Sequence, residues 1–266
     1  MSALIVIPAR YASSRYPGKP LVGLTGATGE TRSLIERTWR AAQGIAGVGR
    51  IVIATDDDRI RDAASAFGAE VVMTPETCAN GTERCAAAHA ALGYGHEVVV
   101  NLQGDAPLTP PWFLEALIEA MQADPTVEMS TPVLRCNGAT LDSLREDRRA
   151  GRVGGTTAVF DGKRHALYFS KEVIPFTAAD FPADAPTPVF HHVGAYAYRA
   201  GALMDYAGWP EGTLERLEGL EQLRFLEAGA RVLCVEVESR GRPFWELNNP
   251  EDVPRIEAMM RMLHLP

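Results

Sequence analysis

Apolar runs and segments with helical spacing alternate along the first half of the chain. Short runs with few polar residues predict strands, most of them buried on both faces, at residues 3–7, 50–55, 69–74 and 96–102. The patterns between these runs predict helices at residues 32–44, 57–67 and 81–93. Strands and helices that alternate in this way form a parallel sheet covered by helices.

The second half of the chain follows a different pattern. Further strands are predicted at residues 128–135, 153–160 and 193–199. Pro, Gly and Asp are frequent between these strands, and Pro and Asp recur in a loop predicted at 175–190. A helix near 213–228, a strand at 231–237 and a last helix from about residue 250 complete the prediction.

The predicted fold class is α/β. We expect a Rossmann-like, mixed but mostly parallel sheet covered by helices on both faces, with a smaller strand-rich part in the second half. Because no clear linker separates the halves, we expect a single domain over residues 1–266. Its later part would extend the sheet and cover the binding site.

The composition argues against several classes of function. The formal net charge of −8 disfavours a protein that coats nucleic acid, so any site for anions must be local. The four cysteines form no Cys-x-x-Cys pair, which favours reduced thiols over a metal site. No apolar run reaches membrane-spanning length. We therefore expect a cytoplasmic protein with no nucleic-acid or membrane partner.

Three segments with candidate chemistry follow predicted strands. They are the loop from Pro8, the stretch 74–84 and "NLQGDAPLTP" after Leu102. Parallel α/β sheets bind ligands at the carboxyl ends of their strands, so this shared placement favours one site. The acidic run 56–58 fits a helix start, where carboxylates accept free backbone N–H groups, better than it fits a metal site.

The loop after the first strand carries Arg10, Arg15 and Lys19, against the acidic balance of the whole chain. Three prolines in and beside this loop restrict its backbone, while Gly18 allows conformations closed to other residues. Cationic groups that approach from several directions suit an oligophosphate. One basic residue alone would be typical of a solvated surface loop, whereas three on a stiff turn favour phosphate binding. The residue order is not that of a Walker loop.

Seven segments of the chain resemble, in order, the motifs of one enzyme family. They are "IPARYASSRYPGKPL" (7–21), "NGTERCA" (80–86), "VNLQGDAP" (100–107), "ALYFSK" (166–171), "HHVGAYAYR" (191–199), "LEGLEQLRFLEAG" (217–229) and "NNPEDV" (248–253). The family is that of the 3-deoxy-manno-octulosonate cytidylyltransferases, or CMP-Kdo synthetases, within the sugar nucleotidyltransferase fold. The resemblance covers nearly the whole chain. The combination most specific for this family is the first motif followed by Gln-Gly-Asp and His-x-Gly-x-Tyr.

The resemblance implies an activity and its partners. Enzymes of this family transfer CMP from CTP to the anomeric hydroxyl of Kdo, an eight-carbon sugar acid of lipopolysaccharide biosynthesis, and release pyrophosphate. The implied cofactor is Mg²⁺, the partners are CTP and a small acidic acceptor, and the assembly is a homodimer. The nucleotide would bind in about residues 1–125. The acceptor and a dimer interface would fall in about 126–230, and a C-terminal strand and helix in 231–266.

The resemblance also assigns residues to roles. The catalytic residues would be Arg10, Arg15, Lys19 and Asp105. The nucleotide would bind to Pro8, Ala9, Arg10, Arg15, Lys19, Asn80, Arg84 and Gln103. The acceptor would bind to Gln103, Lys171, His192, Tyr196, Glu221 and Gln222. Mg²⁺ would bind to Asp105 and Asn248, whose oxygen atoms are suitable ligands.

Two of these assignments have competing interpretations. An aspartate in a Gly-Asp turn, such as Asp105, is most often a turn former, but its position at the end of a buried strand favours the metal role. His192 and Tyr196 lie four residues apart in a strand-like run and would point to the same face. On spacing alone, half-buried packing of that pair is about as favoured as a role in the site.

Four positions depart from the family pattern on the acceptor or metal side. Ala106 replaces the glutamate of Gln-Gly-Asp-Glu-Pro, and Thr157 replaces a lysine. Lys171 replaces an arginine that would clasp the acceptor carboxylate, which removes a two-pronged fork. Asn248 replaces a metal-binding aspartate and brings no negative charge. Glu246 is a candidate to compensate, because strand alternation would put it on the same face as Asn248.

These departures leave three alternatives to an enzyme specific for Kdo. The acceptor could be a different acid, such as a modified ulosonic acid or a small phosphonate. The chain could bind a nucleotide without catalysing transfer. The least favoured alternative is a glycosyltransferase of similar fold that uses the acidic run 56–58 as its Asp-x-Asp metal motif.

Overall fold

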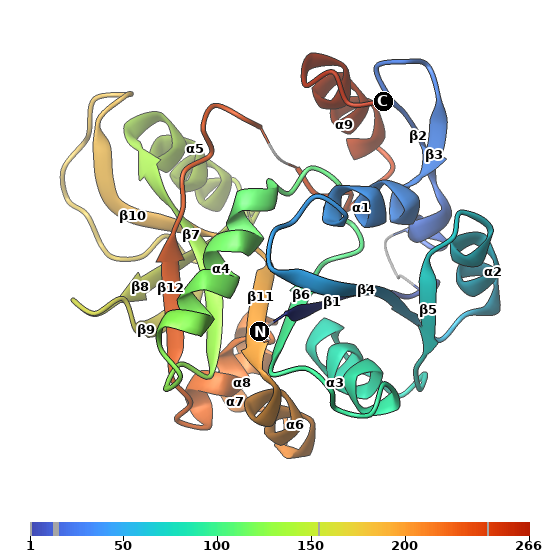
Figure 1. Ribbon diagram of the computed structural model, residues 1–266. Coiled ribbons are helices and arrows are strands. Elements are labelled where there is room, and N and C mark those ends of the chain that lie inside the picture. The colour runs from blue at the N-terminus through green and yellow to red at the C-terminus, as the bar shows by residue number, and fades with distance from the viewer. Residues whose placement is uncertain (1, 13–15, 154, 244) are drawn as a thin grey trace. The chain divides into compact units, whose positions relative to one another are not determined.

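The computed structural model of the chain contains two compact units (Figure 1). The residues described are 2–12, 16–153, 155–243 and 245–266. The first unit comprises residues 1–118 and 239–266, and the second unit comprises residues 119–238. The expectation of a single domain over the whole chain stays a prediction.

The first unit is built on a parallel sheet. Its strands are β1 (Ala3–Ala9), β4 (Val48–Thr55), β5 (Glu70–Met73) and β6 (Val98–Leu102). They lie in the order β5-β4-β1-β6, and every neighbouring pair runs parallel. All residues of β1 and β6 are buried, as expected for central strands covered on both faces. The four strands predicted for the first half of the chain are confirmed.

Helices follow the strands of the first unit and cover its sheet. They are α1 (Leu34–Ala42), α2 (Asp58–Ala66) and α3 (Gly81–Ala91), and all three confirm predicted helices. Figure 1 shows α1 above and α3 below the strands, so helices lie on both faces. Each helix begins at a capping side chain, Ser33, Asp57 or Asn80, whose oxygen accepts a backbone N–H of the first turn. The chain passes into the second unit within α4 (Pro111–Ala123).

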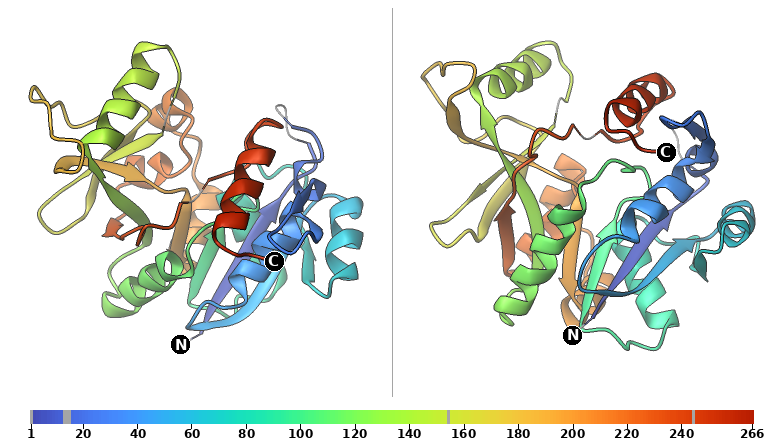
Figure 2. Two further views of the ribbon diagram at one scale, coloured as in Figure 1. Left: turned by 90° about the horizontal axis from the view of Figure 1, so that it is seen from above. Right: turned by 45° about the horizontal axis from the view of Figure 1, so that its top comes forward.

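A small outer layer completes the first unit. It consists of the 3₁₀ turn η1 (Lys19–Leu21), the hairpin strands β2 (Gly23–Thr25) and β3 (Thr31–Ser33), and α9 (Asp252–Met262). Both views of Figure 2 show α9 beside the hairpin, and the backbone N–H of Thr25 donates to Glu257 at 2.8 Å. The last predicted helix is thereby confirmed. The hairpin was not predicted, because strands of three residues have no readable period.

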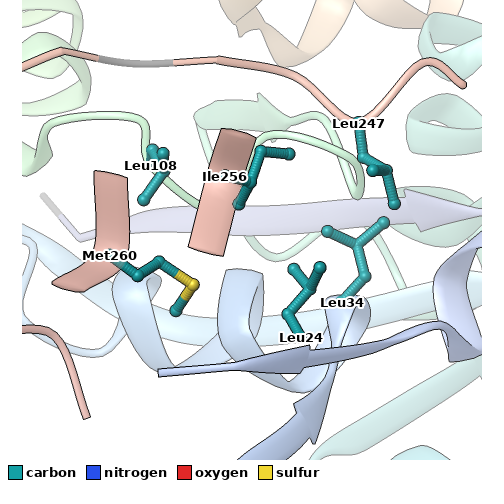
Figure 3. Close-up of a cluster of buried hydrophobic side chains, with 6 residues drawn as sticks. All are labelled: Leu24, Leu34, Leu108, Leu247, Ile256 and Met260. Carbon is teal, nitrogen blue, oxygen red and sulfur yellow. The ribbon is translucent and has the colours of Figure 1, made fainter. Parts of the chain in front are cut away.

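An apolar cluster joins this outer layer to α1 and to the turn after β6. Its buried members, drawn in Figure 3, are Leu24, Leu34, Leu108, Leu247, Ile256 and Met260. Full burial of each such side chain contributes about 1.5–3 kcal/mol. Leu108 follows Asp105 closely and Leu247 precedes Asn248 directly. The cluster therefore holds together the two segments to which the sequence assigns the metal ligands.

The second unit contains mostly antiparallel strands centred on β7. The strands are β7 (Met129–Asn137), β8 (Thr156–Phe160), β9 (Ala166–Ser170), β10 (Pro186–His192), β11 (Ala195–Arg199) and β12 (Val232–Glu236). β7 pairs antiparallel with β10 and β11 and parallel with β12, while β8 pairs with β10 and β9. This unit is the predicted strand-rich part of the second half. Together with the parallel sheet of the first unit, it confirms the predicted fold class.

Two predictions for the second unit were wrong. Its helices are α5 (Gly138–Arg149), α6 (Ala200–Gly208), α7 (Thr213–Glu218) and α8 (Leu223–Glu227). The single helix predicted near 213–228 is interrupted, because Gly219 has a left-handed backbone (φ 62°) that ends α7. The last residues of the predicted loop 175–190 belong to β10, in which Val189 and Phe190 are buried. None of the helices in the described part of the chain is long and apolar enough to cross a membrane.

Candidate active site

The loop after β1 and the turn after β6 leave the sheet of the first unit at the same edge. The two strands are parallel neighbours, and Val6 pairs with Asn101. Pro8 and Ala9 are the last residues of β1 and are buried, and the exposed Arg10 follows directly. The structure thus brings together two of the three segments in which the sequence predicts chemistry.

Lys19 and Asp105 form an ion pair at this edge. Lys19 Nζ donates to Asp105 Oδ2 at 2.6 Å, and the two side chains are 14% and 25% exposed. Lys19 is the first residue of η1, where Pro20 supplies a backbone angle suited to a helical turn. The cation and the carboxylate predicted to face each other are therefore in direct contact. Arg15, the remaining basic residue of the predicted set, lies outside the described residues.

The turn that carries Asp105 is closed by its own backbone. The N–H of Ala106 donates to the backbone oxygen of Gln103 at 3.1 Å. Ala106 is buried, 5% exposed, so a longer acidic side chain at this position would need a different turn or a charged partner. This burial gives a structural reason for the departure from Gln-Gly-Asp-Glu-Pro.

The segment before α9 runs alongside Asp105. The N–H of Leu247 donates to the backbone oxygen of Asp105 at 2.9 Å, which places Asn248 next to the same turn. Asp252 accepts the N–H of Asn248 at 2.9 Å and the indole N–H of Trp245 at 2.9 Å. Burial alone would raise the pKa of Asp252, but these hydrogen bonds outweigh it, and the pKa lies below its ordinary value. An ionised Asp252 therefore anchors the segment.

The predicted strand alternation between Glu246 and Asn248 was wrong, because residues 245–249 form no strand. Both side chains are half-buried, and no regular period fixes the faces they occupy. Compensation by Glu246 for the missing carboxylate stays a prediction.

The oxygen donors beside this turn are suitable for Mg²⁺. Magnesium sites in nucleotide enzymes commonly use one or two carboxylates together with substrate phosphates and water. Asp105 offers a carboxylate, and Asn248 offers an amide oxygen on the neighbouring segment. Within the described ranges, no group of three or more His, Cys, Asp or Glu side chains could hold a metal ion. A metal here would therefore take its remaining ligands from phosphate and solvent.

Asn80 and Arg84, both predicted to bind the nucleotide, lie at the start of α3. Asn80 is the N-cap, and its side chain accepts a backbone N–H at 2.9 Å. Arg84 is 3% exposed, and its guanidinium donates to Asp56 at 2.7 Å and to Thr74 at 2.6 Å. These bonds tie the ends of β4 and β5 to α3. Arg84 thus braces this edge of the sheet, and its contact with a nucleotide stays a prediction.

The acidic run before α2 begins the helix, as the sequence predicts. Asp57 is the N-cap and accepts the N–H of Arg59 at 2.9 Å. Asp58 is the first helical residue and forms an exposed ion pair with Arg61 at 2.5 Å. Because Asp56 is held by Arg84, all three carboxylates have a cationic partner. The Asp-x-Asp metal motif of a glycosyltransferase has no support here.

Three of the predicted acceptor residues meet in the second unit. The ring centroids of His192 and Tyr196 are 5.8 Å apart, and the Tyr196 hydroxyl donates to Gln222 Oε1 at 3.2 Å. His192 Nε2 lies 2.8 Å from the hydroxyl oxygen of Thr131 on β7. His192 ends β10 and Tyr196 belongs to β11, so the assumption of one continuous strand was wrong. The pairing of β10 and β11 with β7 brings the residues together.

The polar side chains of this group are buried, and none of them is charged at neutral pH. His192 is 6% exposed, and burial lowers its pKa to about 3, so the imidazole is uncharged at neutral pH. Gln222 is 2% exposed, and its Nε2 is buried with no hydrogen-bond partner among the described residues. A buried donor left unsatisfied costs about 1–3 kcal/mol, which a polar ligand would recover. The neighbouring Glu221 accepts the hydroxyl of Tyr206 through its backbone oxygen at 3.3 Å.

Lys171 is held by Glu218, a residue that the sequence did not single out. The Glu218 carboxylate accepts the backbone N–H of Lys171 at 2.9 Å and the hydroxyl of Ser170 at 2.6 Å, which ties the end of β9 to α7. The Lys171 ammonium lies over Gly219 and has no ion-pair partner in the part of the chain that the structure describes. A half-buried cation of this kind is suited to an acidic ligand. Glu218 lies in the segment 217–229 that resembles a family motif, but no role was assigned to it, because its contact exists only after folding.

Thr157, which replaces a lysine of the family pattern, has a structural role. It is fully buried in β8. Its hydroxyl donates to the backbone oxygen of Glu172 at 2.7 Å and accepts the N–H of Ile174 at 3.1 Å. Thr157 thereby holds the chain that directly follows Lys171.

The chain is similar to known cytidylyltransferases over most of its length. A family model described as cytidylyltransferase matches residues 4–232. The 3-deoxy-manno-octulosonate cytidylyltransferase of Maricaulis maris (strain MCS10) is 44% identical over 260 residues, covering 98% of this chain and 97% of that protein. The enzyme of the same name from Syntrophotalea carbinolica is 41% identical over 271 residues, covering 99% and 100%. A solved CMP:2-keto-3-deoxy-manno-octonic acid synthetase, complexed with CTP, has a TM-score of 0.83 at 32% identity and covers 99% of this chain and 100% of that chain.

Proposed function

Because the chain belongs to the cytidylyltransferase family and, within it, to the 3-deoxy-manno-octulosonate cytidylyltransferases, we propose that it transfers CMP from CTP to Kdo. The anomeric hydroxyl oxygen forms a bond to the α-phosphorus and the hydroxyl loses its proton. The bond from the α-phosphorus to the bridging oxygen breaks, and pyrophosphate leaves. The observation that carries the proposal is the 2.6 Å contact of Lys19 with Asp105 at the carboxyl edge of the parallel sheet.

The basic loop after β1 is the proposed triphosphate site. Arg10, Arg15 and Lys19 are proposed to bind the phosphates and to stabilise the charge that gathers on the leaving pyrophosphate. The position of Lys19 at the start of η1, with its ammonium turned to Asp105, supports this role. The other proposed nucleotide contacts are Pro8, Ala9, Asn80, Arg84 and Gln103.

Mg²⁺ is the proposed cofactor, with Asp105 and Asn248 as its protein ligands. When bound, it would supply Lewis acidity to the phosphate groups of CTP. The hydrogen bond from Leu247 to the backbone of Asp105 supports the proposal, since it keeps the two ligands adjacent. One carboxylate and one amide carry less negative charge than two carboxylates. We therefore expect weaker metal binding than a second aspartate would give.

The acceptor is proposed to bind through polar groups of the second unit and through Gln103. The unsatisfied Nε2 of Gln222 supports hydrogen bonding to a polar ligand, and the unpaired ammonium of Lys171 supports binding of a carboxylate. The proposed set is Gln103, Lys171, His192, Tyr196, Glu221 and Gln222. Because His192 is neutral, its imidazole can donate a hydrogen bond to a hydroxyl or accept one from it, but it adds no charge to the site.

The proposal includes a cytoplasmic homodimer that serves lipopolysaccharide biosynthesis. All four cysteines are free thiols, three of them buried, which supports a reducing compartment. The dimer stays a prediction from the family. Size-exclusion chromatography with light scattering measures it directly, and a mass of one chain would contradict it.

Release of pyrophosphate tests the proposed reaction. The purified protein is incubated with CTP, MgCl₂ and Kdo, and the nucleotide product is identified by mass spectrometry. We expect pyrophosphate and CMP-Kdo in equal amounts, with UTP a poor substitute for CTP. Binding of CTP with no pyrophosphate released from Kdo would contradict the proposal.

A different acid acceptor is the second candidate function, and Lys171 is the observation that favours it. A single ammonium contacts a carboxylate at one point, whereas the arginine of the family pattern would hold it with two parallel bonds. The same assay with a panel of ulosonic acids and small phosphonates separates the two candidates. Faster turnover of another acid than of Kdo would favour the second.

A further inference from the structure

The proposed phosphate loop, residues 10–19, is closed at its base by Tyr11 and Gly18. The N–H of Gly18 donates to the backbone oxygen of Tyr11 at 2.9 Å. Gly18 has a left-handed backbone (φ 72°) and precedes Lys19, the first residue of η1. A Cβ at position 18 would lie 3.1 Å from two atoms of the Tyr11 side chain. Glycine is needed here for both its backbone angle and the ring that packs on it.

The Tyr11 ring also contacts a residue outside the loop. The guanidinium carbon of Arg59, on α2, lies 3.3 Å from the ring centroid, a close cation–π arrangement. Arg59 Nε donates to Asp57 Oδ1 at 3.0 Å, and its terminal nitrogen donates to Oδ2 at 2.6 Å. Since Asp57 is the N-cap of α2, the guanidinium plane is fixed by the helix itself.

The charges around the loop explain why such a contact is useful. Arg10 and Lys19 place two like charges on the described part of the loop, and like charges repel. Arg59 is a further cation, but its two hydrogen bonds to the Asp57 carboxylate balance its charge. These hydrogen bonds also lower the pKa of Asp57 below its ordinary value. The aromatic ring therefore gains a planar cation to stack on, with little added repulsion of the loop.

We infer that Tyr11 and Arg59 are positioning residues for the triphosphate. The contacts run from Asp57 through Arg59 and Tyr11 to Gly18, and so connect the start of α2 to the residue before Lys19. They hold the loop cations in place without themselves contacting the nucleotide. This inference rests on the proposed function, because it assigns the loop to CTP.

Arg59→Gln tests the inference, with Arg61→Gln as the matched control. Both arginines are exposed on α2, at 59% and 41%, and both bind neighbouring aspartates, but only Arg59 contacts Tyr11. We expect Arg59→Gln to raise KM for CTP about two- to five-fold, the range that a cation–π contact at an exposed site supports. The KM for the acceptor and the melting temperature should not change, and Arg61→Gln should leave all three as in the wild type.

Two substitutions of Tyr11 separate the ring from its hydroxyl. Tyr11→Phe keeps the ring and should retain the wild-type KM for CTP, whereas Tyr11→Leu removes the ring and should match Arg59→Gln. An unchanged KM for CTP in Arg59→Gln would overturn the inference. An equal increase in Arg61→Gln would also overturn it, because the effect would then follow from the lost charge alone.

Calorimetric binding separates a failure of this inference from a failure of the proposed function. CTP and CMP are titrated into the wild type and into Arg59→Gln. The inference requires weaker CTP binding in the variant with unchanged CMP binding, because the loop serves the outer phosphates. This comparison holds even if Kdo is not the acceptor. A wild type that binds no CTP would overturn both proposals.

Discussion

The ammonium nitrogen of Lys19 lies 2.6 Å from Oδ2 of Asp105, although 86 residues separate them in the chain. The parallel neighbours β1 and β6 end at one edge of the sheet, and the two residues lie beyond those ends. Each group partly neutralises the other. A triphosphate with its metal ion offers each of them a partner of opposite charge, the phosphates for the lysine and the cation for the aspartate.

Substitution of Lys19 by Met should reduce catalysis far more than stability. A partly exposed ion pair contributes at most about 1 kcal/mol to folding. Loss of one group that stabilises charge in the transition state costs about 10²–10³-fold in kcat. Steady-state kinetics with CTP and Kdo, together with thermal unfolding, measure both quantities. Lys163→Met, at an exposed position, is the control. Normal turnover by Lys19→Met would contradict the proposed role of the loop in binding the triphosphate.

Substitution of Asn248 by Asp should lower the Mg²⁺ concentration needed for half-maximal activity. A carboxylate binds Mg²⁺ more strongly than an amide, and Asn248 lies beside the turn of Asp105. Asn249→Asp is a matched control, because this exposed neighbour also donates its backbone N–H to Asp252, at 2.7 Å. The measurement is activity against magnesium concentration. Identical magnesium curves for the two variants would mean that Asn248 is not near the metal.

Substitution of Lys171 by Met should raise KM for the acceptor and leave KM for CTP unchanged. The ammonium has no ion-pair partner within the described residues, so its removal breaks no internal ion pair. Loss of a hydrogen bond to a charged group corresponds to about 1.5–3 kcal/mol, or roughly a 10- to 150-fold change. Lys19→Met should show the opposite pattern, with KM for CTP affected and KM for the acceptor unchanged. Equal effects of Lys171→Met on both KM values would contradict a role in acceptor binding.

Stability should fall at acidic pH because of His192. Burial lowers its pKa to about 3, below the ordinary value of about 6.5. As the pH falls below about 6.5, the unfolded chain binds a proton that the folded chain does not, and the free energy of unfolding decreases. Between about pH 6.5 and pH 5 this amounts to about 2 kcal/mol.

Urea unfolding of His192→Gln at about pH 7 and pH 5 measures this effect. The loss of stability on acidification should be smaller in the variant than in the wild type by about 2 kcal/mol. His264→Gln, at an exposed position, should retain the wild-type difference. A His192→Gln variant that loses as much stability as the wild type would show that His192 binds its proton in the folded state.

The local pattern was sufficient for the strands of the first unit and for their helices. β1 and β6 consist almost wholly of apolar residues because both faces are covered, and α2 begins at Asp57 because a carboxylate there accepts the first free N–H groups. The pattern failed at β10, whose residues follow a stretch with prolines and aspartates, and at the short hairpin β2–β3. Pairing with distant strands determined those elements, and pairing leaves no period in a short sequence.

The sequence by itself determined the chemistry of this protein: a basic, proline-rich loop after the first strand, a Gln-Gly-Asp turn after a later one, and the family to which these motifs belong. The tertiary structure decided which of those groups meet. The contacts of Lys19 with Asp105, Glu218 with Lys171, and Arg59 with Tyr11 each join segments that are remote in the chain. Hydrogen bonds and ion pairs act over a few ångströms in space, and only the packing of strands and helices brings such residues within that distance.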